Sequence, residues 1–310
     1  MEDFGNVTDK TKAEVFIFWV RLCAIIGRVA KYLSRSSTAP AAPFPVDLGK
    51  ALIDWAHSLP PYLQLPIQTN VTTTFNCDVH QLHLPYLATI AVLYLKRSSQ
   101  SLPQASPAAI FAASCVARVL KDVLARARTR SLMAITCWYS AVAFIALLRA
   151  SWIESLSKHA NEDLDILTLN INQLRNMWPT ANVFYQGFLR LRASNSRDSS
   201  PRPGQQDVST YAGRDPISEM NANLSVPVMP QAGTADVDHL NMESESIDWT
   251  EYFPFATSET SGITKTLLML QRNDEPFPCD GILPEPMTAP DLMDMFNFVD
   301  YFPEMNLFTQ

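Results

Sequence analysis

Three residues in the first third of the chain have a spacing that suits metal binding. Cys77, His80 and His83 recur every three residues, so a helix would turn them towards one side. Structural zinc prefers thiolate and imidazole ligands, but it takes four of them, and the sequence shows no fourth. We therefore expect no metal here and two histidines packed at a helix edge. His57, beside Trp55, has no nearby pattern of serine, cysteine or carboxylate that would make it a catalytic base.

The glycines and cysteines exclude several common classes of active site. The 310-residue chain has 9 glycines, none between Gly49 and Gly187, and none lies close to another. Phosphate-binding loops and dinucleotide-binding turns need closely spaced glycines, because backbone amides must approach the anion. The G-x-S-x-G motif of α/β-hydrolases is absent too. Five scattered cysteines without a C-x-x-C pair indicate free thiols in a reducing compartment. We expect no enzymatic activity and no cofactor.

Two clusters in the last third of the chain mix aromatic side chains with carboxylates. The first spans 247–255 and the second spans 291–308. Carboxylates that repel one another keep the rings from collapsing together, so the rings stay available to an apolar groove on a partner. This composition is typical of activation segments. The rings that we expect to contact a partner are Trp249, Tyr252, Phe253, Phe255, Phe296, Phe298, Tyr301 and Phe302.

Arg126, Arg128 and Arg130 form another candidate site, a basic patch. Such a patch can contact phosphate or serve nuclear import. It can equally neutralise the C-terminus of a helix, where each cation contributes about 0.3–1 kcal/mol. The sequence leaves both interpretations open. The aromatic residues within 138–152 could line a ligand cavity, but aromatics at helical spacing in an apolar helix more often belong to the core.

Charge divides the chain into two parts. The whole chain has a net charge of −7, but residues 1–195 carry +7 and residues 196–310 carry −14. The low hydrophobicity of 195–245 cannot offset the entropy that ordering would cost. We expect a folded domain over 1–194 and a disordered acidic tail over 195–310, in which the two aromatic clusters act as binding segments.

Apolar spacing predicts an all-α domain. The period is helical in seven stretches, at 15–33, 48–58, 79–93, 110–124, 132–148, 164–178 and 179–189. Ser106 followed by Pro107 marks one helix start, Asn161 is expected to cap another helix, and residues 62–76 are expected to form an extended loop. The uncharged run 132–148 would be about 25 Å long as a helix. That is shorter than the ~30 Å hydrocarbon core of a bilayer, so we expect a buried helix and no membrane partner.

These stretches, taken in order, resemble the regulatory domain of fungal zinc-cluster transcription factors. The segment LIDWAHSLPPYL at 52–63 matches the L-x-x-W-x-x-x-L-P-x-x-L element of that family. The segment HQLHLPYLATIAVLYLKR at 80–97 is similar to the next element, and 106–126, 132–148 and 164–178 follow in the family's order. The opening helix, FIFWVRLCAIIGRVAK, is nearest to cutinase-type, fatty-acid-responsive regulators. The similarity covers roughly residues 4–193.

The resemblance implies a nuclear regulator of RNA polymerase II genes, made of a helical effector domain and an activating tail. The tail would contact the transcription machinery or a coactivator. Lys96-Arg97-Ser98 stand where the family usually has His-Arg-Pro, and the family's six-cysteine zinc cluster is absent. Zinc and DNA contact would therefore belong to a missing N-terminal segment or to a partner.

A homodimer and a small hydrophobic effector are further candidate partners. The alternative function is an all-α receptor or scaffold that binds a small hydrophobic ligand without acting in transcription. No catalytic residue, cofactor site or metal site is assigned.

Overall fold

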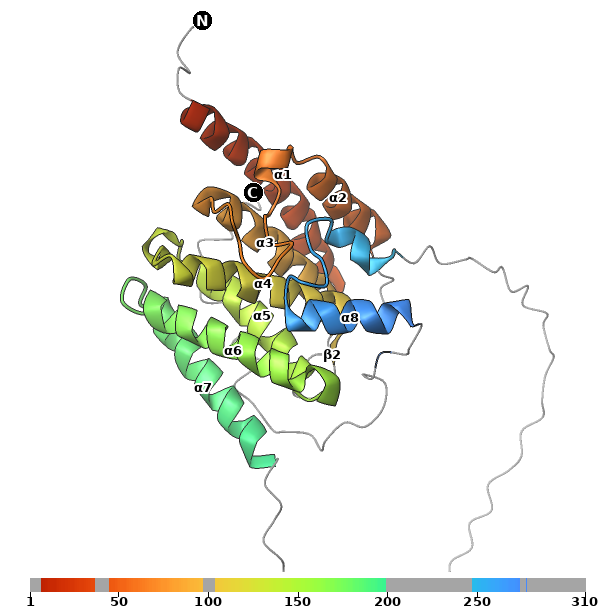
Figure 1. Cartoon of the computed structure of the whole chain (residues 1–310), viewed down its shortest axis with the longest axis vertical. Helices are drawn as coiled ribbons and strands as arrows, with labels where there is room; N and C mark the ends of the chain where they lie inside the picture. Colours follow the sequence, from red (N-terminus) through yellow and green to blue (C-terminus); the bar gives the residue numbers. More distant parts are fainter. Residues whose placement is uncertain (1–6, 37–44, 97–103, 199–246, 274–276, 278–310) are drawn as a thin grey trace, which may run out of the picture.

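The computed structural model describes residues 7–36, 45–96, 104–198, 247–273 and 277, and the fold of these residues is all-α, as predicted (Figure 1). The helices are α1 (Val7–Ser36), α2 (Val46–His57), α3 (Cys77–Tyr94), α4 (Pro107–Ala125), α5 (Thr136–Ala150), α6 (Glu154–Leu174), α7 (Thr180–Asp198) and α8 (Gly262–Arg272). Three short 3-10 turns are η1 (Pro61–Leu63), η2 (Thr129–Ser131) and η3 (Trp249–Tyr252). Strands β1 (Leu95–Lys96) and β2 (Gln104–Ala105) pair antiparallel.

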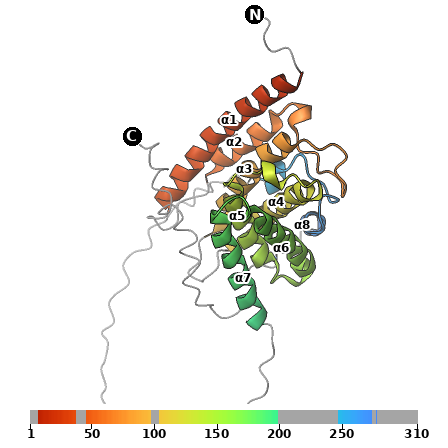
Figure 2. The same cartoon turned by 90° about the vertical axis from the view of Figure 1, so that its left-hand side faces the viewer.

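The core of the fold is built around α3, α4 and α5, in which most side chains are buried. Alanines on α4, including Ala109, Ala112 and Ala113, are fully buried, and their small side chains let neighbouring helices approach closely. On one side, Phe144 of α5 stacks on Phe188 of α7 with ring centres 3.8 Å apart. Helices α1 and α2 cover the opposite end of the core (Figure 1 and Figure 2).

Local signals set most of the helix starts. Helix α3 begins at Cys77, because the Asn76 side chain accepts hydrogen bonds from the amides of the first turn, and it continues through Pro85. Helix α4 starts after Ser106 as predicted, although the Ser106 hydroxyl makes no capping bond. The prediction that Asn161 caps a helix is wrong. Helix α6 already begins at Glu154, one turn after α5 ends.

The predicted boundary between a folded domain over 1–194 and an unstructured tail is wrong in two places. Helix α7 extends to Asp198, and residues 247–273 fold back onto the domain as η3 and α8. We call residues 247–273 the strap. It is drawn in blue in Figure 1, where α8 lies beside α4 and α6. Residues 291–308 lie outside the described residues.

The helix formed by the uncharged run after Leu132 is a core helix. Helix α5 is buried along nearly its whole length. Among the helices that the structure describes, none is both long enough and apolar enough to span a membrane.

Candidate functional site

The aromatic rings of the cluster at 247–255 anchor the strap inside the domain. Tyr252 is fully buried, and Phe253 and Phe255 are each 4% exposed. The Phe253 ring lies 4.4 Å from that of Phe111 on α4, and the Tyr86 hydroxyl on α3 donates a hydrogen bond of 2.8 Å to the backbone oxygen of Tyr252. The expectation that these three rings contact a partner is therefore wrong, because the chain's own core already buries their apolar surface.

Trp249, at the start of the strap, is only partly buried. Its ring centre lies 5.3 Å from that of Phe111, so it too packs on the domain and does not stand free for a partner. The remaining predicted rings, Phe296, Phe298, Tyr301 and Phe302, lie outside the described residues. The cluster at 247–255 is thus a structural anchor, and the role of 291–308 stays a prediction.

Hydroxyl groups fasten the middle of the strap. Thr260 is buried and donates a hydrogen bond of 2.7 Å to the backbone oxygen of Ile67, which ties the strap to the loop after η1. Ser261 caps α8, since its side-chain oxygen accepts a bond of 3.1 Å from the amide of Thr264. The same Ser261 oxygen lies 2.8 Å from that of Ser114 on α4. The strap is therefore held by polar contacts as well as by its rings.

A buried carboxylate ends this series of hydrogen bonds. The Ser114 hydroxyl donates a bond of 2.6 Å to Asp163 on α6, and Asp163 is only 9% exposed. Burial raises the pKa of Asp163 to about 7, although the bond from Ser114 and the positive charge of Lys121 oppose the shift. Asp163 therefore changes charge near neutral pH directly beneath the strap.

Arg118 and Asp122, one turn apart on α4, form a buried ion pair. Arg118 also donates to the backbone oxygen of Thr69 at 3.1 Å, and Asp122 accepts a bond from the Thr72 hydroxyl. Burial by itself would raise the pKa of Asp122, but the nearby His80 ring and the hydrogen bonds from Thr72 and Arg118 outweigh it and lower the pKa to about 2. This network fixes the loop after η1 to α4, which is a structural task.

The three residues with metal-like spacing do not converge. The Cys77 sulfur lies 3.1 Å from the Ser131 hydroxyl, whereas His80 faces Asp122. The Nε2 of His83 lies 2.9 Å from the backbone oxygen of Leu63 on η1. Within the part of the chain that the structure describes, no group of three or more His, Cys, Asp or Glu side chains is arranged to hold a metal ion.

The three arginines after α4 do not share one exposed patch. Arg126 donates a bond of 2.8 Å to the backbone oxygen of Thr72, and its guanidinium lies 4.6 Å from the ring centre of Phe75. Arg128 and Arg130 are exposed. The structure therefore assigns Arg126 to packing and leaves two exposed cations for any contact with phosphate.

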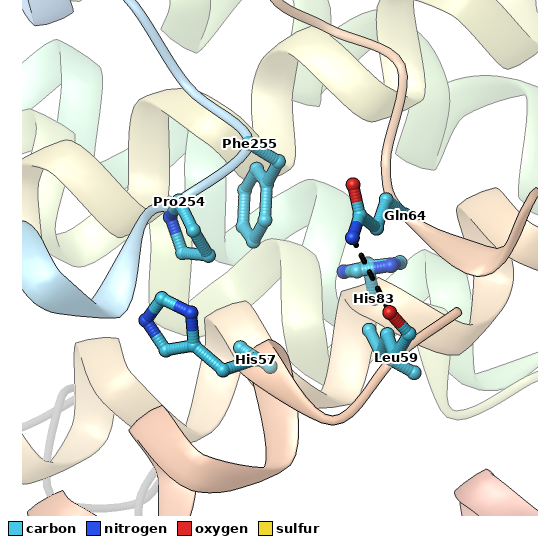
Figure 3. Close-up of a pocket in the computed structure, with 7 residues that line it drawn as sticks. His57, Leu59, Gln64, His83, Pro254 and Phe255 are labelled. Carbon is cyan, nitrogen blue, oxygen red and sulfur yellow. Dashed lines mark hydrogen bonds between the residues drawn. The ribbon is translucent and has the colours of Figure 1, made fainter. Parts of the chain in front are cut away.

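A small cavity opens between the domain and the strap (Figure 3). Its volume is about 200 Å³, and its lining residues are Ala56, His57, Leu59, Gln64, His83, Pro254 and Phe255. Figure 3 shows Pro254 and Phe255 of the strap facing Gln64 and His83 across it. Since burial lowers the pKa of His83 to about 4, its ring is uncharged at neutral pH. The cavity is smaller than most ligand pockets, which measure about 300–1,000 Å³.

The aromatic residues of α5 do not line this cavity. Phe144 lies in the core against Phe188, and the ring of Trp152, just after α5, packs under the Arg149 guanidinium at 4.6 Å. The preference for core packing over a ligand site within 138–152 is confirmed for Phe144. The cavity at the strap was not predicted, because its walls come from three segments far apart in the sequence.

Comparison with known proteins identifies no relative: no protein-family model matches the chain, and no curated protein or solved structure is similar to it. A function must therefore rest on the chemistry of this chain.

Proposed function

We propose that the chain is the regulatory and activating part of a transcription regulator of RNA polymerase II genes, acting in the nucleus. In this proposal the helical domain and its strap form the regulatory body, and residues 291–308 contact a coactivator or the transcription machinery. DNA is reached through a further segment or a partner, because an acidic chain binds phosphate poorly by itself.

The observation that carries the proposal is the structural role of the motif at 52–63. Its four defining apolar side chains, Leu52, Trp55, Leu59 and Leu63, are all buried. The Trp55 ring stacks on Tyr86 of α3 with ring centres 5.0 Å apart. The backbone oxygen of Leu63 forms a hydrogen bond with the His83 ring of the same helix. The motif thus joins α2 and η1 to the next element of the resemblance, which supports a domain of that kind.

The second support is the composition of 291–308. This segment holds ten large apolar side chains and four carboxylates, with no basic residue. Large apolar side chains interleaved with carboxylates are the composition of segments that bind a partner, because the mutual repulsion of the carboxylates opposes collapse of the apolar side chains on one another. Since the rings of the cluster at 247–255 are engaged in the domain, 291–308 is the remaining candidate for contact with a coactivator.

A reporter assay tests the proposal with the full chain fused to an unrelated DNA-binding domain. Replacing Phe296 and Phe298 by serine should lower reporter activity at least about fivefold, because aromatic anchors dominate such interfaces. The matched control replaces the same two residues by tyrosine, which keeps the rings and should retain most of the activity. A wild-type fusion that is expressed but does not activate the reporter would refute the activating role.

The cavity at the strap favours a second candidate function, binding of a small, flat ligand. A molecule in this space would contact His57 of α2 and Phe255 of the strap at once, so it would stabilise the folded chain. Indole should therefore raise the thermal midpoint, whereas a long-chain acid should not fit about 200 Å³. An unchanged midpoint with indole at millimolar concentration would count against this function.

A further inference from the structure

Helix α1 has an apolar stripe on the side that faces away from the domain. Phe16, Ile17 and Val20 are 61%, 47% and 51% exposed. Ala24 and Gly27 continue the stripe at steps of four and three residues, and they too are exposed. The opposite side of the helix is anchored in the core. Three large exposed side chains on one helical face form the kind of patch that usually has a partner.

Basic residues border this stripe. Arg21 and Arg28 are exposed and stand seven residues apart, with Arg35 a further seven along, so the three follow one line on the helix. Over Val7–Ser36 the helix has six basic and two acidic residues, a net charge of +4. A partner for this face should therefore combine apolar side chains with negative charge.

The chain itself contains a segment with that chemistry. Residues 291–308 carry a net charge of −4, with Asp291 and Asp294 among the four carboxylates. Leu292, Met295, Phe296 and Val299 follow the spacing i, i+3, i+4 and i+7, which would place them on one face of a helix. The segment thus matches α1 in both respects, with apolar side chains for the stripe and carboxylates for the arginines.

The connection between the strap and residues 291–308 has a long reach. Thirteen residues lie between Phe277, the last described residue, and Asp291, which makes fourteen Cα–Cα steps. An extended chain covers up to about 3.3–3.6 Å per residue, or roughly 50 Å here. Helix α1 is about 45 Å long at 1.5 Å per residue, so the span of the extended connection is comparable to the length of the helix.

A second copy of α1 is a poorer occupant of the same face. Two helices that each carry a charge of +4 repel each other, and the arginine lines would lie next to the contact. The opposite charges of α1 and 291–308 attract, and an intramolecular partner has an effective concentration on the order of millimolar.

We infer that residues 291–308 dock on the outward face of α1 in the same molecule, with their apolar side chains over Phe16, Ile17 and Val20. The docking itself does not depend on the proposed function. Its effect on coactivator binding does, because the proposed function assigns 291–308 to that contact. Docking would hide Phe296 and the apolar side chains beside it, so a coactivator would have to compete with α1 for them. The contact itself is tested without any reporter.

Cys23 provides a probe in the native chain. It is exposed on α1, three residues after Val20 and four before Gly27, at the edge of the stripe. Docking should shield its thiol from iodoacetamide. Replacing Phe296 and Phe298 by serine should speed alkylation of Cys23 about fivefold, since effective concentrations near millimolar make even weak docking populated. These substitutions leave the net charge of the chain unchanged, so the variant differs from the wild type only in its apolar side chains, and a faster reaction reports lost contact.

Two further variants make the test specific. Ile17→Ser, within the stripe, should speed alkylation of Cys23 as well, whereas Val183→Ser, at a position 63% exposed on α7, should not. Alkylation of Cys77, read from its own peptide, should stay constant in all variants. Equal Cys23 rates in the wild type and the Phe296 and Phe298 variant would overturn the inference. A Cys23 rate that falls as protein concentration rises would also overturn it, because the occupant would then come from a second copy.

Discussion

At the scale of single residues, the charge of Asp163 links the stability of the fold to pH. Hydrogen bonds run from the first turn of α8 through Ser261 and Ser114 to this carboxylate. An aspartate has an ordinary pKa of 3.8, and burial raises that of Asp163 to about 7 in the folded chain. The folded chain therefore binds this proton more tightly than the unfolded chain does.

The pH dependence of folding follows from this shift. The stabilising contribution is complete below about pH 3.8 and is lost as the pH rises through about 7. At about 1.36 kcal/mol per pKa unit, the full effect is on the order of 4 kcal/mol. As the pH rises from 4.5 to 8, the free energy of unfolding of Asp163→Asn should therefore increase relative to that of the wild type by about 2–4 kcal/mol.

Urea unfolding at several pH values measures this difference. Glu154→Gln, at an exposed position in the first turn of the same helix, is the control and should change little across the range. A constant difference between Asp163→Asn and the wild type at all pH values would show that Asp163 does not titrate near neutrality.

At the scale of elements, the helices before residue 194 were predictable because each carries its own apolar period. The strap was not, since its burial depends on surfaces far away in the sequence. Tyr252 bonds to Tyr86 and Tyr94, 166 and 158 positions earlier. Helix α8 does have a local signal, a Ser261 cap followed by Ile263 and Leu267. The surrounding carboxylates and prolines pointed instead to an unstructured tail.

Docking of the strap on α2 depends on a glycine. A Cβ atom added at Gly49 would overlap the Tyr252 hydroxyl and the side chain of Ile247. Gly49→Ala should therefore loosen the strap, although alanine favours the helix itself by up to about 1 kcal/mol. Hydrogen exchange of residues 247–273 should become at least about tenfold faster, which corresponds to about 1.4 kcal/mol of lost local stability.

Gly27→Ala is the matched control, because a Cβ there meets nothing within 4 Å. It also lies in a long helix, so it makes the same gain in helix propensity without touching the strap. If both variants leave exchange in 247–273 unchanged, the strap does not depend on the close approach at Gly49.

At the scale of the whole molecule, the folded unit is discontinuous in sequence. Residues 1–195 and 196–310 differ in net charge and proline content, but this difference does not decide which residues enter the core. A few apolar side chains within an acidic stretch are enough to complete a core, if the helices before them leave a matching surface open.

This arrangement predicts different outcomes for two truncated chains. The strap buries five large apolar side chains, those of Tyr252, Phe253, Phe255, Ile263 and Leu267. Each contributes about 1.5–3 kcal/mol when buried, and their sum is comparable to the roughly 5–15 kcal/mol that stabilises a whole domain. Residues 1–277 should therefore melt cooperatively within a few degrees of the full chain, whereas residues 1–246 should show no cooperative transition in calorimetry.

The two truncations also separate the strap from the acidic segment that follows it. If the shorter chain loses its transition only because it aggregates, adding a synthetic peptide of residues 247–273 should restore it, since the peptide supplies the missing core. A chain of residues 1–246 that melts like the full chain would mean that the strap lies on an already complete domain. The burial of Tyr252 and Phe253 between α3 and α4 argues against that outcome, because their removal would open those helices to water.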